Sequence, residues 1–557
     1  MHVRLSRLLR WGAVATVLAV VGLLAPPAQA ASFVPLSGDG SSWAEPAIHQ
    51  WSVDVESRGI RIDFGGQGSQ AGRTKYMQGQ ADFAASDIAF ITDSNPDPFG
   101  GGGESQQYAY SYIPIVAGGT SFLYNLTVGG KKITNLRLSG DTITKIFTGQ
   151  ITNWNDARIT KDYGMRLPSK RINVITRSDG SGATYMFTRW MAKQYGSQWT
   201  SFCKARGGGG ACGPTEFYPG FSGSIQRQGS DQVANYIASP SYGDGSIGYD
   251  EYAYALNSKI PVVKVLNQAG YYTLPTASNV AIALQKAVID NNSKSVTYLM
   301  QNLDHVYTNP DRRTYPLSSY SYLIVPRTSR VANGITVGPP GRFMDGSNPK
   351  TSAKGATLST WLNYVLCGAQ QKAGALGYSP LPKNLVQGGF LQEGYIPSHV
   401  TVPDSKQLNG CNNPTYHNGH NYLVEQAPFP SKCDKVGTPL TCAGGGGGSS
   451  GGGSNGSGGG GSNGSGGGGS GSGNGSSGGP AASRSTAGGA VDPDTGKQLG
   501  GSDNSVANDN VSALPVSLTG HGGGSPLFAV LTALEILGAI LVPTLLGTWL
   551  RKRRPRA

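Results

Sequence analysis

The sequence predicts an α/β fold over residues 32–405. Apolar runs of strand length alternate with helix-like segments throughout this range, as is typical of a sheet covered by helices. Turns rich in glycine and serine join several of these runs to the helices that follow them. The expected strands are 60–64, 113–116, 122–126, 172–175 and 322–325, and the expected helices are 43–51, 70–78, 183–195, 278–291 and 357–374.

The N-terminal end of the chain has the layout of a secretory signal peptide. Residues 1–30 contain Arg4, Arg7 and Arg10, then a short apolar run, then small residues that end at Ala30. The apolar run is short for a helix that spans a bilayer, so we expect cleavage after Ala30 and export of the rest of the chain.

The C-terminal end predicts a membrane anchor. Residues 526–550 are almost wholly apolar and long enough to span a bilayer, although Glu535, whose role stays open, lies among them. The tail 551–557 is basic, and the positive-inside rule places it in the cytoplasm. Residues 443–525 are polar and rich in glycine and serine, so we expect a disordered linker with a reach of about 50 Å. The globular part is therefore expected on the extracellular face of the cell membrane, held by a single transmembrane helix.

All the cysteines lie in the part of the chain that is expected outside the cell, which favours disulfides over free thiols. Half of them belong to residues 406–442, an extension without a clear hydrophobic period. Their spacing favours the pairs Cys203–Cys212 and Cys433–Cys442, which leaves Cys367 with Cys411, and other pairings stay open. A metal site at Cys411 with His417 and His420 is the alternative, but this spacing matches no strong zinc pattern.

Of the formal net charge of +13, about half belongs to the signal peptide and to the C-terminal anchor with its tail, so the charge of the part expected outside the cell is mild. Its modest positive balance favours small anions as ligands. Because no basic stripe interleaved with aromatic residues occurs in the sequence, we expect no nucleic-acid partner.

The stretch 177–182 is the strongest candidate for an anion site. It lies between an expected strand and an expected helix, where unpaired backbone N–H groups and the helix dipole favour an anion. Arg177 offers a planar guanidinium that suits an oxyanion, and Asp179 is placed to brace it. Ser181 and Gly182 would add a hydroxyl and N–H groups. A serine nucleophile is the alternative, but these turns contain no histidine that would act as its base.

Two further turns have the same order of strand, turn and helix. In the first, residues 37–43, we expect Ser42 to cap the helix that follows. Taken alone, this turn predicts a capped helix and no more. The second turn, residues 64–72, contains four glycines between a strand and a helix.

The second turn also allows a different interpretation. The spacing of Gly66, Gly68 and Ala71 resembles a dinucleotide-binding fingerprint, with Asp82 or Asp87 as the ribose-binding acid. Against this interpretation, the segment is not the first strand of a repeated βαβ half. An exported protein also has no supply of nicotinamide cofactor, so we expect no cofactor.

Asp87 would give an anion site selectivity for phosphate. Phosphate near neutral pH still carries a proton, and the carboxylate of Asp87 can accept a hydrogen bond from it. Fully ionised sulfate has no proton to donate, so it would leave Asp87 unsatisfied and would be repelled.

These turns, with four further motifs, resemble the PstS-type phosphate-binding proteins of ABC phosphate importers. The further motifs are the stretches 146–156, 245–249, 252–255 and 376–382. The resemblance implies a two-lobed type II periplasmic-binding-protein fold that closes around phosphate by hinge motion. It places lobe 1 at residues 32–120 and 272–405, and lobe 2 at residues 121–271.

The resemblance also implies the ligand set. The phosphate ligands of the family correspond to Ser42, Trp43, Ser69, Asp87, Arg177, Ser181, Gly182 and Ala183. Trp43 stands where the family usually has another aromatic residue, and its backbone N–H would be the donor. Ala183 departs from the family pattern, which often has a hydroxyl residue there. Either the hydroxyl of Thr184 replaces the one that is missing at Ala183, or no residue replaces it.

The sequence therefore predicts an extracellular, membrane-tethered receptor that binds inorganic phosphate and hands it to an ABC permease. A surface phosphate sensor or cell-wall scaffold with the same fold is the alternative. An enzyme that acts on phosphorylated substrates is a third possibility, but we expect no catalytic activity and no metal.

Overall fold

The computed structural model describes residues 33–329, 331–332, 335–336, 339–346 and 352–440. The expected signal peptide, linker, transmembrane helix and basic tail lie outside these residues. Within the described part, none of the helices has both the length and the apolar character to cross a bilayer.

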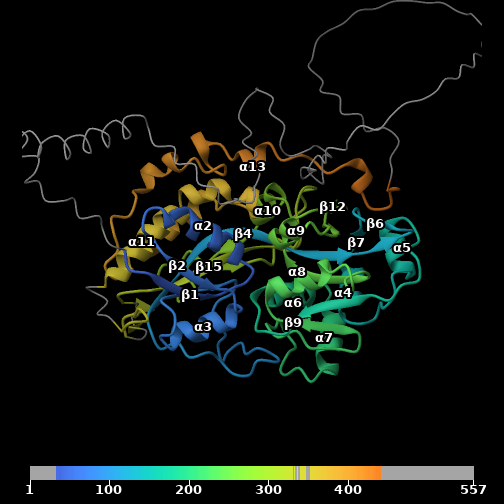
Figure 1. The fold of residues 1–557 in the computed structure, drawn as a ribbon, viewed down its shortest axis with the longest axis horizontal. Helices are drawn as coiled ribbons and strands as arrows, with labels where there is room; N and C mark the ends of the chain where they lie inside the picture. Colours follow the sequence, from blue (N-terminus) through green and yellow to red (C-terminus); the bar gives the residue numbers. More distant parts are fainter. Residues whose placement is uncertain (1–32, 330, 333–334, 337–338, 347–351, 441–557) are drawn as a thin grey trace, which may run out of the picture. The chain divides into compact units, whose positions relative to one another are not determined.

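One mixed eight-stranded sheet forms the centre of the molecule (Figure 1). In spatial order its strands are β2 (Ile62–Gly65), β1 (Leu36–Gly40), β3 (Phe83–Ser86), β15 (Ser318–Pro326), β4 (Tyr110–Asn125), β10 (Ser246–Glu251), β8 (Asn173–Arg177) and β9 (Ser224–Arg227). Strands β1, β2 and β3 are parallel to one another, and so are β8, β9 and β10. Between these two groups, β4 and β15 pair with their neighbours in antiparallel fashion.

Strand β4 belongs to both halves of the sheet. Up to Gly119 it pairs with β15, and from Thr120 onwards it pairs with β10. We predicted two strands here, 113–116 and 122–126, and this prediction is wrong because β4 is continuous and wholly buried. The small residues between the two runs reflect crowding, since a Cβ added at Gly119 would lie 2.5 Å from Cβ of Pro275. The expected division into lobes at 120/121 and 271/272 stays a prediction, and we use it below to name the two halves.

Helices cover both groups of parallel strands, which confirms the α/β prediction (Figure 1). The helices are α2 (Glu45–Glu56), α3 (Ser69–Met77), α4 (Gly140–Phe147), α5 (Ala157–Tyr163), α6 (Gly182–Gln194), α7 (Gly196–Ala205), α8 (Gly229–Ala238), α9 (Tyr252–Ser258), α10 (Ala277–Leu284), α11 (Ala353–Val365), α12 (Lys383–Glu393) and α13 (Tyr422–Glu425).

Two helices are shorter than predicted. Helix α10 ends at Leu284 because the chain turns there into the strand pair β13 (Val288–Ile289) and β14 (Gln301–Asn302). Helix α11 ends at Val365, just before the 3₁₀ turn Gly368–Lys372.

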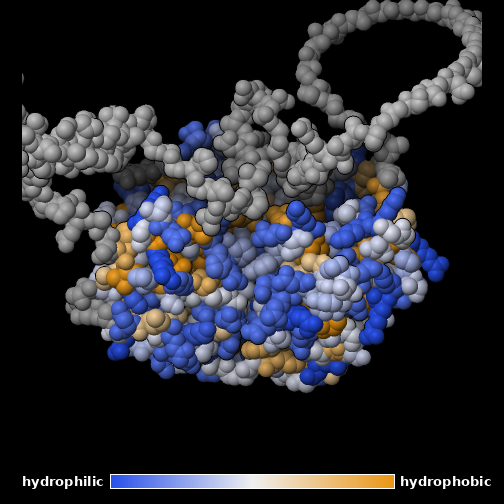
Figure 2. All heavy atoms as spheres, in the orientation of Figure 1, coloured by the Kyte–Doolittle hydropathy of each residue, from blue (hydrophilic) through white to orange (hydrophobic). Residues whose placement is uncertain are grey.

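The remaining strands are short. Strands β7 (Arg137–Leu138), β11 (Lys264–Leu266) and β12 (Tyr272–Thr273) form a small sheet, and the others form the pairs β5 (Thr127–Val128) with β6 (Lys131–Lys132) and β16 (Val331–Ala332) with β17 (Ile335–Thr336). The face drawn in Figure 2 is largely polar, with apolar side chains in scattered groups, which is ordinary for a surface that faces water.

Two of the expected disulfides are confirmed. Cys203 is bonded to Cys212, and Cys367 is bonded to Cys411. The third expected pair includes Cys442, which lies outside the described residues. The alternative metal site is not supported, because Cys411 is in a disulfide and the described residues contain no group of three metal-ligating side chains.

The extension beyond the predicted lobes lies along the globular part and consists mostly of short turns. It contains the 3₁₀ turns Ser405–Cys411, His417–Gly419 and Lys432–Asp434 and the single-turn helix α13. We call residues 405–440 the strap.

Candidate anion-binding site

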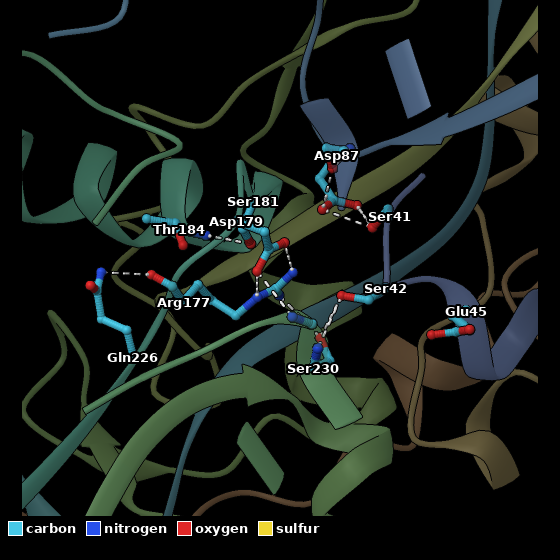
Figure 3. Close-up of polar contacts among 12 residues, drawn as sticks. Ser41, Ser42, Glu45, Asp87, Arg177, Asp179, Ser181, Thr184, Gln226 and Ser230 are labelled. Carbon is cyan, nitrogen blue, oxygen red and sulfur yellow. Dashed lines mark hydrogen bonds and ion pairs between the residues drawn. The ribbon is translucent and has the colours of Figure 1, made fainter. Parts of the chain in front are cut away.

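The structure brings the predicted turns together at one edge of the sheet. Each turn follows the carboxyl end of a strand, namely β1, β2, β3 or β8, and all but the one after β3 lead into a helix. Parallel strands place such ends at the same edge, and the helix N-termini then direct N–H groups to one place. Figure 3 shows Asp87 with Ser41 on one side, and Arg177 with Asp179 and Ser230 on the other.

Asp87 is buried among serine hydroxyls. Ser41 donates to both of its carboxylate oxygens, at 2.8 Å and 3.0 Å, Ser321 donates at 2.7 Å and Ser69 at 3.3 Å. Burial raises the pKa of Asp87, although the hydrogen bonds from these serines and the charge of Arg177 act in the opposite direction. A carboxylate with a raised pKa is a stronger hydrogen-bond acceptor, which suits a ligand that carries a proton.

Arg177 is buried and braced by its own turn, as predicted. Its Nε donates to Oδ1 of Asp179 at 2.8 Å, and its Nη2 is paired with Oδ2 of Asp179. Burial disfavours the charge of Asp179, but the charge and hydrogen bonds of Arg177 outweigh it and lower the pKa of Asp179. Nη1 of Arg177 donates to the hydroxyl of Ser230 at 3.2 Å. The guanidinium is therefore a fixed cation in a buried site.

Four backbone N–H groups at the helix entrances donate to no other residue of the described part. They belong to Ser42, Trp43, Gly182 and Ala183. Buried N–H groups are rarely left without an acceptor, so this set is suited to an oxyanion.

The loops of the two lobes are in contact across the site. A Cβ added at Gly182 would lie 2.6 Å from Oγ of Ser69 and would collide with Asp87. The N–H of Gln70 donates to the carbonyl of Gly180 at 3.1 Å. The structure therefore has the lobes closed, and glycine is required at position 182 because of this close approach.

Ser42 does not cap the helix, so that prediction is wrong. The N-cap of α2 is Ala44, whose N–H donates to Oγ of Ser41 at 3.3 Å. The helix begins later than expected, and Ser42 lies outside its first turn. Its hydroxyl instead contacts the hydroxyl of Ser230 at 2.9 Å.

Ser181 and Thr184 serve the local structure of α6. Ser181 is the N-cap, and its Oγ accepts a hydrogen bond from the N–H of Thr184 at 3.3 Å. The hydroxyl of Thr184 contacts the hydroxyl of Tyr249 at 2.6 Å. Thr184 therefore does not replace the hydroxyl that is missing at Ala183, which is itself buried.

The dinucleotide alternative is not supported by the geometry. Asp82 is buried against Lys354, whose Nζ lies 2.9 Å from Oδ1, and it also accepts a hydrogen bond from the N–H of Ser37 at 2.9 Å. The other acid, Asp87, faces serines. The glycine at position 68 is explained by the positive φ of 104° there and by the close approach of Asp179.

The site contains residues that the sequence analysis missed. They are Ser41, Ser230, Ser321, Asp250 and Glu251. Ser230 had a signal, because Gly229-Ser230 follows strand β9 and opens helix α8, the same order as in the predicted turns. Ser321 had none, since it is one serine of a strand.

Two buried acids lie near Arg177 at the end of β10. Burial, opposed by the charge of Arg177, raises the pKa of Asp250 to about 7. Burial and the neighbouring charge of Asp250 raise the pKa of Glu251 well above its usual range. Among the described residues no hydrogen-bond partner faces Oδ2 of Asp250 or either carboxylate oxygen of Glu251. The raised pKa values limit the negative charge that the site presents to an anion.

The comparisons with known proteins agree with this geometry. A family model described as "PBP superfamily domain" matches residues 25–339, more than half of the chain, so the chain belongs to the PBP superfamily. The phosphate-binding protein PstS of Xylella fastidiosa is 30% identical over 365 residues, which are 65% of this chain and 85% of the relative. The PstS protein of Haemophilus influenzae is 28% identical over 364 residues, which are 65% of this chain and 92% of the relative. The chain therefore belongs to the PstS-type phosphate-binding proteins.

A solved structure of a phosphate-binding protein from Stenotrophomonas maltophilia covers 64% of this chain and 92% of its own chain. It shares 17% sequence identity and has a TM-score of 0.41. At this level the likeness carries no argument about the site.

Proposed function

We propose that this chain is a receptor that binds inorganic phosphate between its two lobes and delivers it to an ABC importer. The observation that carries the proposal is the pairing of a buried, braced Arg177 with a buried Asp87 across a set of N–H groups without acceptors. Such a site suits an anion that carries a proton. The relatives are binding proteins, and we propose no catalytic activity for this chain.

The ligands would come from both lobes. Lobe 1 would contribute the N–H groups of Ser42 and Trp43, the Ser69 hydroxyl and the Asp87 carboxylate. Lobe 2 would contribute the Arg177 guanidinium, the Ser181 hydroxyl and the N–H groups of Gly182 and Ala183. Phosphate would therefore join the two lobes, and release would require them to separate about β4, the strand they share.

Asp87 would set the selectivity. The proton of phosphate would be donated to Asp87, while sulfate would place an ionised oxygen against a carboxylate in a buried site. The cost of burying two acceptors that face each other is several-fold larger than the gain from a single neutral hydrogen bond.

Calorimetric titration of the purified protein with phosphate and with sulfate tests the proposal. We expect phosphate to bind with a one-to-one stoichiometry and sulfate to bind far more weakly. Equal binding of both anions would contradict the role of Asp87, and no binding of phosphate would contradict the proposed function itself.

We also propose that the receptor stays attached to the cell by its C-terminal segment, residues 526–550, and that it faces the outside. This proposal rests on the sequence pattern alone. Protease treatment of intact cells checks it: the globular part should be released from the cells, while the basic tail 551–557 should stay protected.

A further inference from the structure

Ser230 is buried at the start of α8 and contacts both lobes at the site. Its hydroxyl accepts a hydrogen bond from Nη1 of Arg177 at 3.2 Å and lies 2.9 Å from the hydroxyl of Ser42. Its backbone N–H donates to Oγ of Ser42 at 3.2 Å. A single serine thus connects the cation of lobe 2 to the first turn of lobe 1 (Figure 3).

We propose that Ser230 is a positioning residue of the phosphate site. Asp179 accepts from Nε and Nη2 of Arg177, and Ser230 accepts from Nη1, so the guanidinium is fixed at each of its nitrogens. Each terminal nitrogen of the guanidinium carries a further N–H group that these contacts do not use. The two remaining N–H groups point in the same direction and can donate together to a phosphate. The contact with Ser42 joins the two lobes in the arrangement observed. The inference rests on the proposed function.

Ser230→Ala tests this role, with Ser230→Thr as the variant that keeps the hydroxyl. We expect phosphate affinity to fall about tenfold in Ser230→Ala, mainly through faster dissociation, because one hydrogen bond to a charged group is lost. Ser230→Thr should recover most of the affinity. Ser241→Ala is the matched control, because Ser241 is exposed and lies just beyond the end of α8.

Binding and stability are read out separately. The inference requires that the ligand-free melting temperature of Ser230→Ala stays close to that of the unchanged protein while its phosphate dissociation becomes faster. Unchanged affinity in Ser230→Ala, or an equal loss in Ser230→Thr, would overturn it. Failure of the unchanged protein to bind phosphate would instead overturn the proposed function.

A second, independent observation concerns the strap. Its first part is fixed to lobe 1 by the disulfide Cys367–Cys411. Asn413 is buried, and its side-chain amide donates to the carbonyl of Leu381 at 3.0 Å. The amide of Gln371 donates to the carbonyl of Cys411 at 2.7 Å. This end of the strap is therefore attached both covalently and by hydrogen bonds.

The last part of the strap is attached to lobe 2. Nη1 of Arg137 in β7 donates to the carbonyl of Cys433 at 2.7 Å. Lys264 in β11 forms an ion pair with Asp434 at 2.9 Å. The N–H of Val436 donates to the carbonyl of Gly270 at 2.9 Å. The strap thus begins on one lobe and ends on the other.

Between its two ends the strap contacts Arg313, which lies two residues before Tyr315. Arg313 donates to the carbonyl of Val424 at 3.0 Å and lies over the ring of Phe429. Two residues further along, the hydroxyl of Tyr315 donates at 2.8 Å to the carbonyl of Thr120, where β4 changes partner. In Figure 1 the strap is the orange segment that carries α13 along one side of the molecule.

We infer that the strap restrains the opening of the two lobes and so favours the closed form. Its contacts with both lobes are all made in the closed arrangement, and a rotation about β4 would move one set of anchors relative to the other. A segment fixed at both ends resists such a rotation. Phosphate would then bind a protein that is already biased toward closure.

Distance measurements between the lobes test the strap without phosphate. Labels that do not use cysteine would replace Val53 in lobe 1 and Tyr242 in lobe 2, which are 63% and 56% exposed. We expect a longer and broader distance distribution in Cys367→Ser/Cys411→Ser than in the labelled protein with an intact strap. Arg137→Ala, which removes one of the attachments at the other end, should act in the same direction.

The same variants should bind phosphate about threefold more weakly, because a smaller fraction of the molecules is closed before binding. Lys432→Ala, at an exposed strap position, is the control and should change neither quantity. If both anchor variants fold and keep the distance distribution of the parent, the inference is wrong, whatever their affinity for phosphate.

Discussion

The two lobes provide the site with groups of opposite character. On lobe 1 the central group is an acid, Asp87, surrounded by the hydroxyls of Ser41, Ser69 and Ser321. On lobe 2 it is a cation, the guanidinium of Arg177, whose charge is balanced within its own turn by Asp179. Both groups follow the carboxyl end of a parallel strand, but only the second has a partner of opposite charge at hydrogen-bond distance.

This difference separates attraction from discrimination. In the proposed site, the braced guanidinium of lobe 2 would attract any oxyanion of suitable size. The acid of lobe 1, surrounded by neutral hydroxyls, would accept only an anion that brings a proton. Changes on lobe 2 should therefore weaken all anions together, whereas changes at Asp87 should alter the ratio between anions.

The largest effect is expected for Arg177→Ala. Phosphate affinity should fall by about 100-fold or more, since each hydrogen bond to a charged group contributes about 1.5–3 kcal/mol and the loss also leaves Asp179 unpaired. Calorimetric titration measures this. Arg158→Ala is a matched control, because Arg158 is braced by Asp156 at 2.8 Å in the same manner but lies partly exposed on α5. A similar affinity in both variants would remove Arg177 from the site.

Asp87→Asn is expected to act mainly on selectivity. The amide keeps the size of the side chain, but when its oxygen accepts the phosphate proton its NH2 group faces serine hydroxyls that donate to the carboxylate in the parent, so phosphate should bind about tenfold more weakly. Sulfate should bind more tightly than to the parent, and competition between the two anions measures the ratio. Ser321→Ala keeps the carboxylate and should keep the ratio. If the ratio in Asp87→Asn equals that of the parent, discrimination does not come from lobe 1.

The pH dependence of stability should reveal the extra acid of lobe 2. Because the pKa of Asp250 is raised to about 7 in the folded protein, the stability that its protonated form contributes is present below about pH 4 and is lost as pH rises through about 7. Asp250→Asn should therefore melt at least about 2 °C higher than the parent at pH 8, with a smaller difference at pH 5.

Differential scanning calorimetry at the two pH values measures this difference. Asp63→Asn is the control, since the side chain of Asp63 is 59% exposed. A melting difference that does not change with pH would mean that Asp250 is not a buried titrating group.

The smallest effect is expected at Ala183. Ala183→Ser restores a hydroxyl beside a free N–H, and one neutral hydrogen bond should raise phosphate affinity about fivefold. Ala183→Gly keeps the N–H without a side chain and should leave the affinity unchanged. Calorimetric titration of both variants with phosphate tests whether lobe 2 lacks a donor. A higher phosphate affinity in Ala183→Ser but not in Ala183→Gly would show that lobe 2 lacks one donor. Equal affinities would show that its N–H groups suffice.

The parts of the site that depend on local order were predictable. Arg177 and Asp179 lie two residues apart in one turn, so the sequence alone places their chemistry. Asp87 was predicted from its chemistry, although strand β3, which it follows, was not among the expected strands. Ser321 was not predictable, because it reaches Asp87 only through the antiparallel pairing of β15 with β3, in which Tyr322 lies opposite Ser86. Pairing between strands more than 200 residues apart leaves no local pattern.

The fold shows the same limit. Helix α6 was expected at 183–195 and observed at Gly182–Gln194, because its apolar period and its capping serine are local features. Strand β4 was divided in the prediction because glycines interrupt its apolar pattern. Those glycines are required by residues that are distant in the sequence, since a Cβ added at Gly118 would lie 2.6 Å from the ring of Trp43.

The sharing of β4 has a consequence for how the protein unfolds. Neither half of the sheet is complete without this strand, since its first part pairs with β15 of one half and its second part pairs with β10 of the other. Loss of either half would expose the unpaired edge of β4 to water and to other chains. We therefore expect the described part of the chain to melt in one cooperative transition, so that it offers proteases no half-unfolded form to cut.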